Sequence, residues 1–152
     1  MIRLSTGAIN ALLSTGSLQT VFTNAVLCLY SGTQPATADA AETGNLLATV
    51  SEQAGAFVPG QPGNGLNFDE AVGKRIAKEP AEVWKGIYGA SGTLGWFRLY
   101  ANAKTLGDST TAVRIDGSIG TSRTDVIVAS TAATAGGSMT LDEFALTFNN
   151  LT

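Results

Sequence analysis

The residue types that carry out catalysis are few in this chain, and their spacing does not bring them together. The 152 residues include no histidine and one cysteine, Cys28, so the commonest general base is missing and a closed zinc site cannot form. The acidic pairs Asp69-Glu70 and Asp142-Glu143 are adjacent in sequence, and neighbouring residues on a strand point to opposite faces. We therefore expect no enzymatic activity and no catalytic, cofactor-binding or metal-binding residues, while a glycosidase pair built from distant carboxylates stays open.

Four aromatic residues on neighbouring segments could instead bind a ligand: Trp84, Tyr88, Trp96 and Tyr100. If their rings share an exposed face, they could stack on sugars, and the chain would be a carbohydrate-binding module for a host surface. If the rings fill the core, they contribute to packing alone, which is the commoner use of aromatic side chains. Burial of both tryptophans would remove the first alternative.

The strand expected at residues 94–103 positions two of these rings and is the candidate central strand. Its two faces differ in character, one apolar (Phe97, Leu99, Ala101) and the other mixed (Trp96, Arg98, Tyr100, Asn102). A charged side chain on a buried strand needs a carboxylate or carbonyl partner. Arg98 therefore either finds such a partner in its own chain or marks a face that another subunit covers.

Two short helical patterns begin the sequence, with Ser5 or Thr6 capping the first and Ser17 capping the second. Apolar residues then recur at the spacing of one helix face. We interpret residues 1–24 as a helical prelude or arm. Its apolar side either covers an open end of the sheet core or docks onto a neighbouring subunit.

From residue 25 onward the apolar pattern has a period of two, interrupted by Gly, Pro, Asn and Asp. About eight strands are expected, at 26–31, 46–51, 66–72, 82–88, 94–103, 112–119, 125–130 and 138–148. The strand at 112–119 is expected unless Asp116-Gly117 is itself a hairpin turn. In the last run the apolar set moves from odd to even positions near Asp142 and Glu143, which predicts a β-bulge or a crossing between sheets. The sequence thus predicts one domain over residues 1–152, mainly β, with residues 25–152 forming an antiparallel β-sandwich or jelly roll.

Composition points to association. Charged residues make up 14% of the chain, against about 25% in typical soluble proteins, and such a surface opposes association weakly. The net charge of −3 offers no basic field for nucleic acid. The longest apolar run, 25–30, is far short of the roughly 20 residues that span a bilayer. We expect a homo-oligomer with neither nucleic acid nor membrane as partner, made in a cytoplasm-like compartment because the N-terminus lacks the apolar core of a signal peptide.

Seven segments form a recognisable set: Arg3 to Gly7, Ala25 to Ala36, Ala38 to Gly44, Leu46-Leu47, Gly65 to Asp69, Gly95 to Arg98 and Arg114 to Ser118. Together they resemble small virion structural proteins of tailed bacteriophages. The resemblance implies a virion component assembled in the host cytoplasm, with the major capsid protein and copies of itself as partners. A capsid decoration or cement protein is the first expectation, and a tail, neck or fibre-associated subunit that binds tail subunits is the second.

Candidate contact residues follow from these patterns. The apolar residues of the prelude are one group: Leu4, Ile9, Leu13 and Phe22. The tip of the longest expected loop, residues 55–65, supplies a second group: Gln61, Pro62 and Asn64. Arg98 is the last candidate, because a charge on the central strand could mark a covered face.

Overall fold

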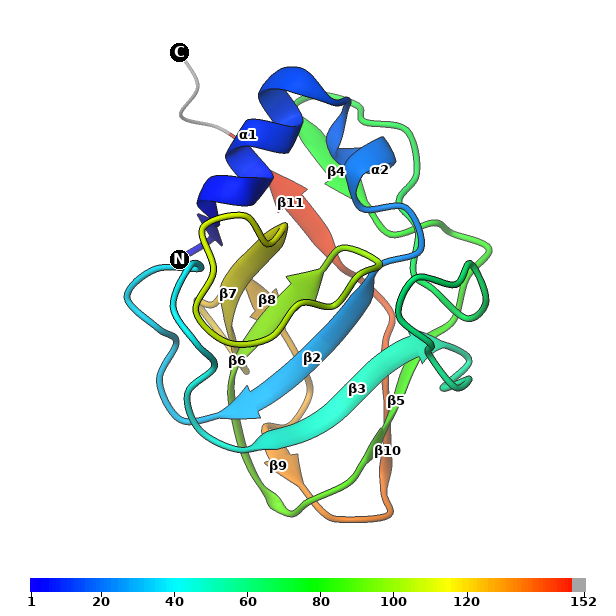
Figure 1. Ribbon diagram of the computed structural model, residues 1–152. Helices are drawn as coiled ribbons and strands as arrows, with labels where there is room; N and C mark the ends of the chain where they lie inside the picture. The colour runs from blue at the N-terminus through cyan, green and yellow to red at the C-terminus, as the bar shows by residue number, and fades with distance from the viewer. Residues whose placement is uncertain (149–152) are drawn as a thin grey trace.

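The chain folds mainly into antiparallel β-sheet, with two short helices at its N-terminus (Figure 1). The structure, a computed structural model, describes residues 1–148. At this level the fold class expected from the sequence is confirmed. In chain order the elements are β1 (Arg3–Leu4), α1 (Thr6–Ser14), α2 (Leu18–Val21), β2 (Val26–Ser31), β3 (Leu46–Glu52), β4 (Arg75–Ala77), β5 (Trp84–Tyr88), β6 (Gly92–Tyr100), β7 (Arg114–Gly120), β8 (Val126–Ile127), β9 (Ala132–Ala133), β10 (Ser138–Leu141) and β11 (Ala145–Thr147).

Nine of these strands form the main sheet, in the order β1-β7-β6-β2-β3-β5-β10, with β8 beside β7 and β9 beside β6. All pairs are antiparallel except β7 and β8, which are parallel. The strands β4 and β11 form a separate two-stranded sheet. Their residues Ile76 and Leu146 belong to the same buried apolar cluster as residues of the main sheet.

The strand β6 is central, as the sequence predicts, because β2 flanks it on one side and β7 on the other. Phe97 and Leu99 point into the core, whereas Trp96 and Tyr100 lie in a second cluster on the opposite face. We call that opposite face the outer face of the sheet. It is also buried, so β6 has no face exposed to solvent along Trp96 to Tyr100.

Aromatic packing organises the core around Phe144. The centroid of its ring lies 5.1 Å from that of Trp84, 5.4 Å from that of Phe97 and 6.0 Å from that of Phe68. The indole N–H of Trp84 donates to Oε2 of Glu82 at 2.9 Å, which satisfies its single donor. Phe144 lies between β10 and β11, directly before Ala145, so its burial in the core anchors the connection between these two strands.

Both predicted helix caps are confirmed. The Ser5 hydroxyl accepts from the N–H of Ala8 at 3.0 Å, and that of Ser17 accepts from the N–H of Thr20 at 3.3 Å. Ser5 does more than cap, because it also donates to the Ala112 carbonyl at 2.7 Å and accepts from the N–H of Arg114 at 3.0 Å. Ser5 therefore fixes α1 to the start of β7.

The run 66–72 is not a strand, contrary to the expectation. It makes isolated bridges only, Ala25 with Leu66, Phe68 with Lys78 and Val72 with Arg75. Side chains take the place of a neighbouring strand: the N–H of Asn67 donates to Glu82, and the N–H of Glu70 donates to Asp69. Such local bonds compete with sheet ladders. The run 125–130 likewise contributes only the two residues of β8.

The predicted irregularity near Asp142 and Glu143 is confirmed as a crossing between sheets. Before these residues, β10 pairs with β5 in the main sheet, and after them β11 pairs with β4 in the small sheet. The switch from odd to even apolar positions keeps Leu141 and Leu146 in one core.

The Ser5 contacts generate a stability prediction. Ser5→Ala removes a cap and leaves the buried Arg114 N–H and Ala112 carbonyl without their partner, so we expect the free energy of unfolding to fall by about 2 kcal/mol. Ser17→Ala removes an exposed cap and should cost less than about 1 kcal/mol. Urea denaturation of the two variants measures this difference. Equal losses would show that Ser5 acts as a cap alone.

Candidate interaction surfaces

The contact residues predicted in the prelude divide into exposed and buried ones. On α1, Ile9 is 47% and Leu13 81% exposed. Leu4 in β1 is half-buried against the core. Phe22 has no exposed surface. It therefore covers an end of the sheet core, the first of the two alternatives expected for the prelude. Phe22 thus fits the covering role, whereas the docking role of the prelude stays a prediction that Ile9 and Leu13 on α1 leave possible.

The predicted loop tip is exposed and lies away from α1 in Figure 1. Gln61, Pro62 and Asn64 are all at the surface. Two hydrogen bonds anchor the loop. Asn102 Nδ2 donates to the Gln61 carbonyl at 2.8 Å, and Asn64 Nδ2 donates to the Ala56 carbonyl at 2.8 Å. The structure does not bring this tip together with α1 into one surface.

Arg98 is fully buried and is paired within its own chain. It lies opposite Asp116 in the register of β6 and β7. Its Nε and Nη2 donate to the two carboxylate oxygens of Asp116 at 2.6 and 2.7 Å, and both side chains are 0% exposed. A bidentate pair of this kind is the strongest form of arginine–carboxylate contact. Arg98 was expected either to find a carboxylate or carbonyl partner in its own chain or to mark a face that another subunit covers. The structure shows the first alternative.

The remaining guanidinium nitrogen of Arg98 holds the loop between β2 and β3. Nη1 donates to the Ala40 carbonyl and to Oε1 of Glu42, both at 3.0 Å. Glu42 also accepts from the Tyr100 hydroxyl at 2.7 Å and from the N–H of Gly107 at 3.1 Å. Because Gly107 lies in the loop between β6 and β7, Glu42 ties two loops together over the outer face.

Arg114 anchors the same two loops from β7. Nη2 donates to the Thr105 carbonyl at 2.7 Å, and Nη1 donates to the Ala38 carbonyl at 3.5 Å. The Arg114 guanidinium carbon lies 5.9 Å from the centroid of the Tyr100 ring, within the range of a cation–π contact. We refer to Glu42, Arg98, Tyr100, Arg114 and Asp116 as the arginine clamp.

The electrostatics of the clamp follow from burial and pairing. Burial alone would lower the pKa of Arg98, but the hydrogen bonds and charge of Asp116 raise that pKa above its usual value, so Arg98 stays charged. Burial raises the pKa of Asp116, and Arg98 opposes the rise. Burial would also raise the pKa of Glu42, but hydrogen bonds from Tyr100 and the Gly107 N–H, with the charge of Arg98, lower it. Glu42 is therefore held in its ionised form.

The four aromatic rings proposed as a sugar platform are all buried. Trp84 and Trp96 are 0% exposed, Tyr100 is 1% and Tyr88 is 8%. Trp96 stacks on Tyr30 with centroids 4.5 Å apart, beneath the loop whose Thr43 carbonyl accepts its indole N–H at 3.2 Å. None of the four rings offers a face to a sugar, so we do not propose the carbohydrate-binding function.

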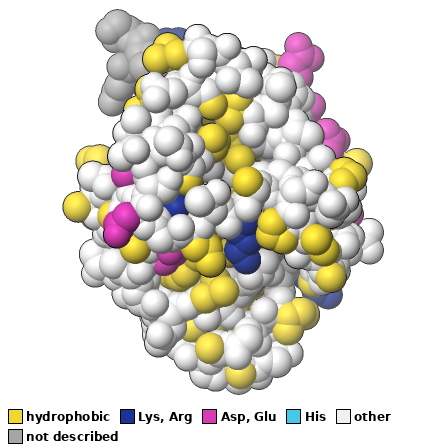
Figure 2. Space-filling model, in the orientation of Figure 1, with side chains coloured by type: hydrophobic (Ala, Val, Ile, Leu, Met, Phe, Trp, Pro, Cys, Tyr) yellow, Lys and Arg dark blue, Asp and Glu magenta, His cyan; other side chains and the backbone are white. Residues whose placement is uncertain are grey.

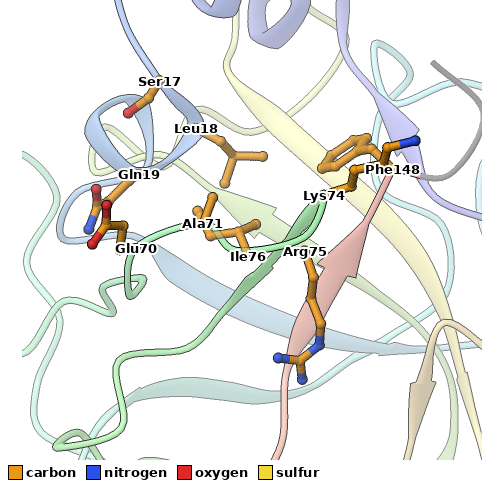
Figure 3. A pocket seen from close by; sticks show the side chains of 9 residues that line it. All are labelled: Ser17, Leu18, Gln19, Glu70, Ala71, Lys74, Arg75, Ile76 and Phe148. Carbon is orange, nitrogen blue, oxygen red and sulfur yellow. The ribbon is translucent and has the colours of Figure 1, made fainter. Parts of the chain in front are cut away.

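A surface groove of about 580 Å³ lies between α2 and the start of β4 (Figure 3). Figure 3 shows Leu18 from α2 facing Ala71 and Ile76 across it, with Phe148 at the other end. Its rim is polar: Ser17, Gln19, Glu70, Lys74 and Arg75. Because Phe148 is the last residue that the structure describes, we assign no occupant to this groove.

Comparison with protein-family models, with curated proteins and with solved structures finds no match. Within residues 1–148 no three acidic or cysteine side chains gather closely enough to hold a metal ion, and no helix is long and apolar enough to cross a membrane. On the face seen in Figure 2, charged side chains are sparse and separated.

Sequence reasoning placed Arg98 but missed most of its partners. Arg114 and Asp116 lie on the face of β7 opposite the core and are fully buried, because the loops that carry Ala38 and Thr105 cover them. The signal available for Asp116 was its charge, which is opposite to that of Arg98 on the neighbouring strand. Glu42 gave no comparable signal, since it lies in a loop that no periodicity describes.

The Arg98–Asp116 pair predicts a large loss of stability on truncation. Arg98→Met leaves the Asp116 carboxylate buried and unpaired, which should lower the free energy of unfolding by about 3–5 kcal/mol. The matched control is Arg75→Met, because Arg75 pairs with Glu143 where both side chains are exposed, and such pairs contribute about 1 kcal/mol or less. Urea denaturation measures both. Similar losses in the two variants would contradict the role of the buried pair.

The lowered pKa of Glu42 predicts a pH dependence. A carboxyl whose pKa is lower when folded contributes stability above its unfolded pKa, about 4.3 for Glu, and loses it as pH falls through the folded value. Near neutral pH we expect the free energy of unfolding of wild type to exceed that of Glu42→Gln by about 1–2 kcal/mol. This difference should shrink below about pH 4. Denaturation of both proteins across pH measures the difference. A difference that does not change with pH would contradict the assignment.

Proposed function

We propose that this protein is a non-enzymatic structural component of a bacteriophage virion, a capsid decoration or cement protein that binds as a homo-oligomer at junctions between major capsid subunits. The observation that carries the binding role is the apolar pair Ile9 and Leu13 exposed on α1. The class of particle is supported by the resemblance of the segments described above to small virion proteins.

The helix α1 is suited to be a docking element because it is rigidly attached. Besides the Ser5 contacts, Thr6 donates from its backbone N–H and its hydroxyl to the two carboxylate oxygens of Asp39, at 2.8 and 2.7 Å. Ile9 and Leu13 are four residues apart and so lie on one helix side. A pre-ordered apolar ridge loses little conformational freedom on binding.

The proposed mechanism is mechanical. Apolar surface buried at a junction between capsid subunits raises the cost of separating them and so opposes the outward stress of packaged DNA. We also propose that the small β4–β11 sheet acts as the second layer of the β-sandwich or jelly roll expected from the sequence. The burial of Ile76 and Leu146 in the common core supports this arrangement.

The test uses purified virions from which the protein has been stripped. Added wild-type protein should rebind and restore resistance to heat. Leu13→Glu keeps a good helix former but removes about 1.5–3 kcal/mol of apolar burial, so binding should weaken about tenfold or more. The control is Leu106→Glu in the loop after β6, where the leucine is 59% exposed.

Three results would contradict the proposal. One is unchanged heat resistance of stripped capsids, which would exclude a cement role. Another is equal binding by wild type and Leu13→Glu, which would exclude α1 as the docking element. The third is a copy number of roughly six or twelve per virion, which indicates a symmetric tail or neck ring in place of the capsid lattice, where hundreds are expected.

A further inference from the structure

The wall of the main sheet has an opening between β8 and β10, which we call the seam. The strand β10 pairs with β5 alone, and β8 pairs with β7 alone. Two grooves, of about 410 and 200 Å³, run between residues 124–132 on one side and 138–145 on the other. They share Ile127 and Glu143 among their lining residues, so the two grooves adjoin along the seam.

Backbone geometry gives the β10 edge free hydrogen-bonding groups. The N–H of Tyr88 donates to the Gly137 carbonyl at 2.8 Å, and the register continues with Met139 opposite Gly86. In an antiparallel pair the residues directed at the neighbouring strand alternate. The N–H and C=O groups of Ser138 and Thr140 therefore point into the seam, and both side chains are exposed.

The β8 edge is arranged in the same way. The N–H of Val128 donates to the Gly120 carbonyl at 2.9 Å, and Val126 lies opposite Ile119 in the parallel register with β7. By the same alternation, the backbone of Ile127, between these two residues, faces the seam. Its side chain is 64% exposed. One strand laid in the seam would thus meet free backbone groups on both sides.

The side chains that line the seam define what kind of strand would fit. Val126, Leu141 and Phe144 are buried and give it an apolar floor. Its charged lining residues are all acidic: Asp125, Asp142 and Glu143. Asp125 is already paired with the N-terminal ammonium group, and Glu143 is paired with Arg75. Among the described residues that line the seam, Asp142 is therefore the carboxylate without a cationic partner. An occupant that complements this lining alternates apolar side chains and carries Lys or Arg.

We propose that an extended, basic segment of a partner protein adds as a β-strand in the seam between β8 and β10. The main-chain hydrogen bonds would supply affinity, and the apolar floor with its acidic border would supply specificity. This inference does not depend on the virion assignment, because it follows from strand pairing, register and the lining residues alone.

The test selects binders from a random peptide library on the full-length chain. We expect the selected peptides to contain Lys or Arg and to slow hydrogen exchange at the amides of Ile127 and Thr140. Thr140→Pro removes the N–H that faces the seam without removing a bond to β5, and proline is tolerated on edge strands. It should weaken peptide binding about tenfold, whereas Thr140→Ala, which keeps the N–H, should bind as wild type does.

A second variant guards against a folding defect in Thr140→Pro. Asp142→Lys changes an exposed side chain. It should also weaken binding of the basic peptides about tenfold, because an attractive charge contact becomes a repulsive one. The proposal is overturned if no peptide is selected, or if the peptides bind Thr140→Pro and Asp142→Lys as tightly as wild type. Protection of Ile127 and Thr140 in the concentrated chain without peptide would identify a second copy as the occupant and would also overturn it.

Discussion

The buried ion pair between Arg98 and Asp116 is the interaction on which the rest of the structure depends. Neither charge has any solvent contact, and a buried charge without a partner is very unfavourable. The pair therefore requires β6 and β7 to stay in register, and the third nitrogen of Arg98 requires the loop carrying Ala40 and Glu42 to fold over the sheet. Closing that loop buries Trp96 and Tyr100 as well. One polar contact thus determines which aromatic faces the molecule can offer, and the outer face offers none.

What the sequence predicted and what it missed have distinct physical causes. The central strand, both helix caps and the crossing at Asp142 and Glu143 leave periodic or positional signals, because side-chain direction alternates along a strand and a cap has a fixed offset from its helix. The run 66–72 shows strand residues but no strand, because its backbone bonds are scattered over several partners: Asn67 and Glu70 donate to side chains, and the remaining contacts are isolated bridges. The helix pattern identified Ile9 and Leu13 as apolar candidates, but their exposure is known only from the structure. Phe22 shares that pattern and is buried, which only the packing of the whole chain decides.

With the outer face closed by its own loops, surfaces for a partner are confined to other parts of the described chain. The exposed side of α1 carries the apolar side chains of Ile9 and Leu13, and the helix is held through Ser5 and Thr6. The seam instead offers backbone edges with acidic lining residues. The two differ in the chemistry they select, one suiting an apolar surface and the other an extended basic segment. A low overall charge suits a protein whose working state is an assembly.

The most direct measurement is hydrogen–deuterium exchange of the full chain, free in solution and bound to the particle. If the arginine clamp closes the outer face internally, the amides of β2 and β6 are already protected in the free chain and do not change on assembly. Residues around Ile9 and Leu13 in α1 should gain protection only on the particle. Strong new protection of β2 and β6 on assembly, with α1 unchanged, would show that a partner covers the outer face and would contradict the central claim.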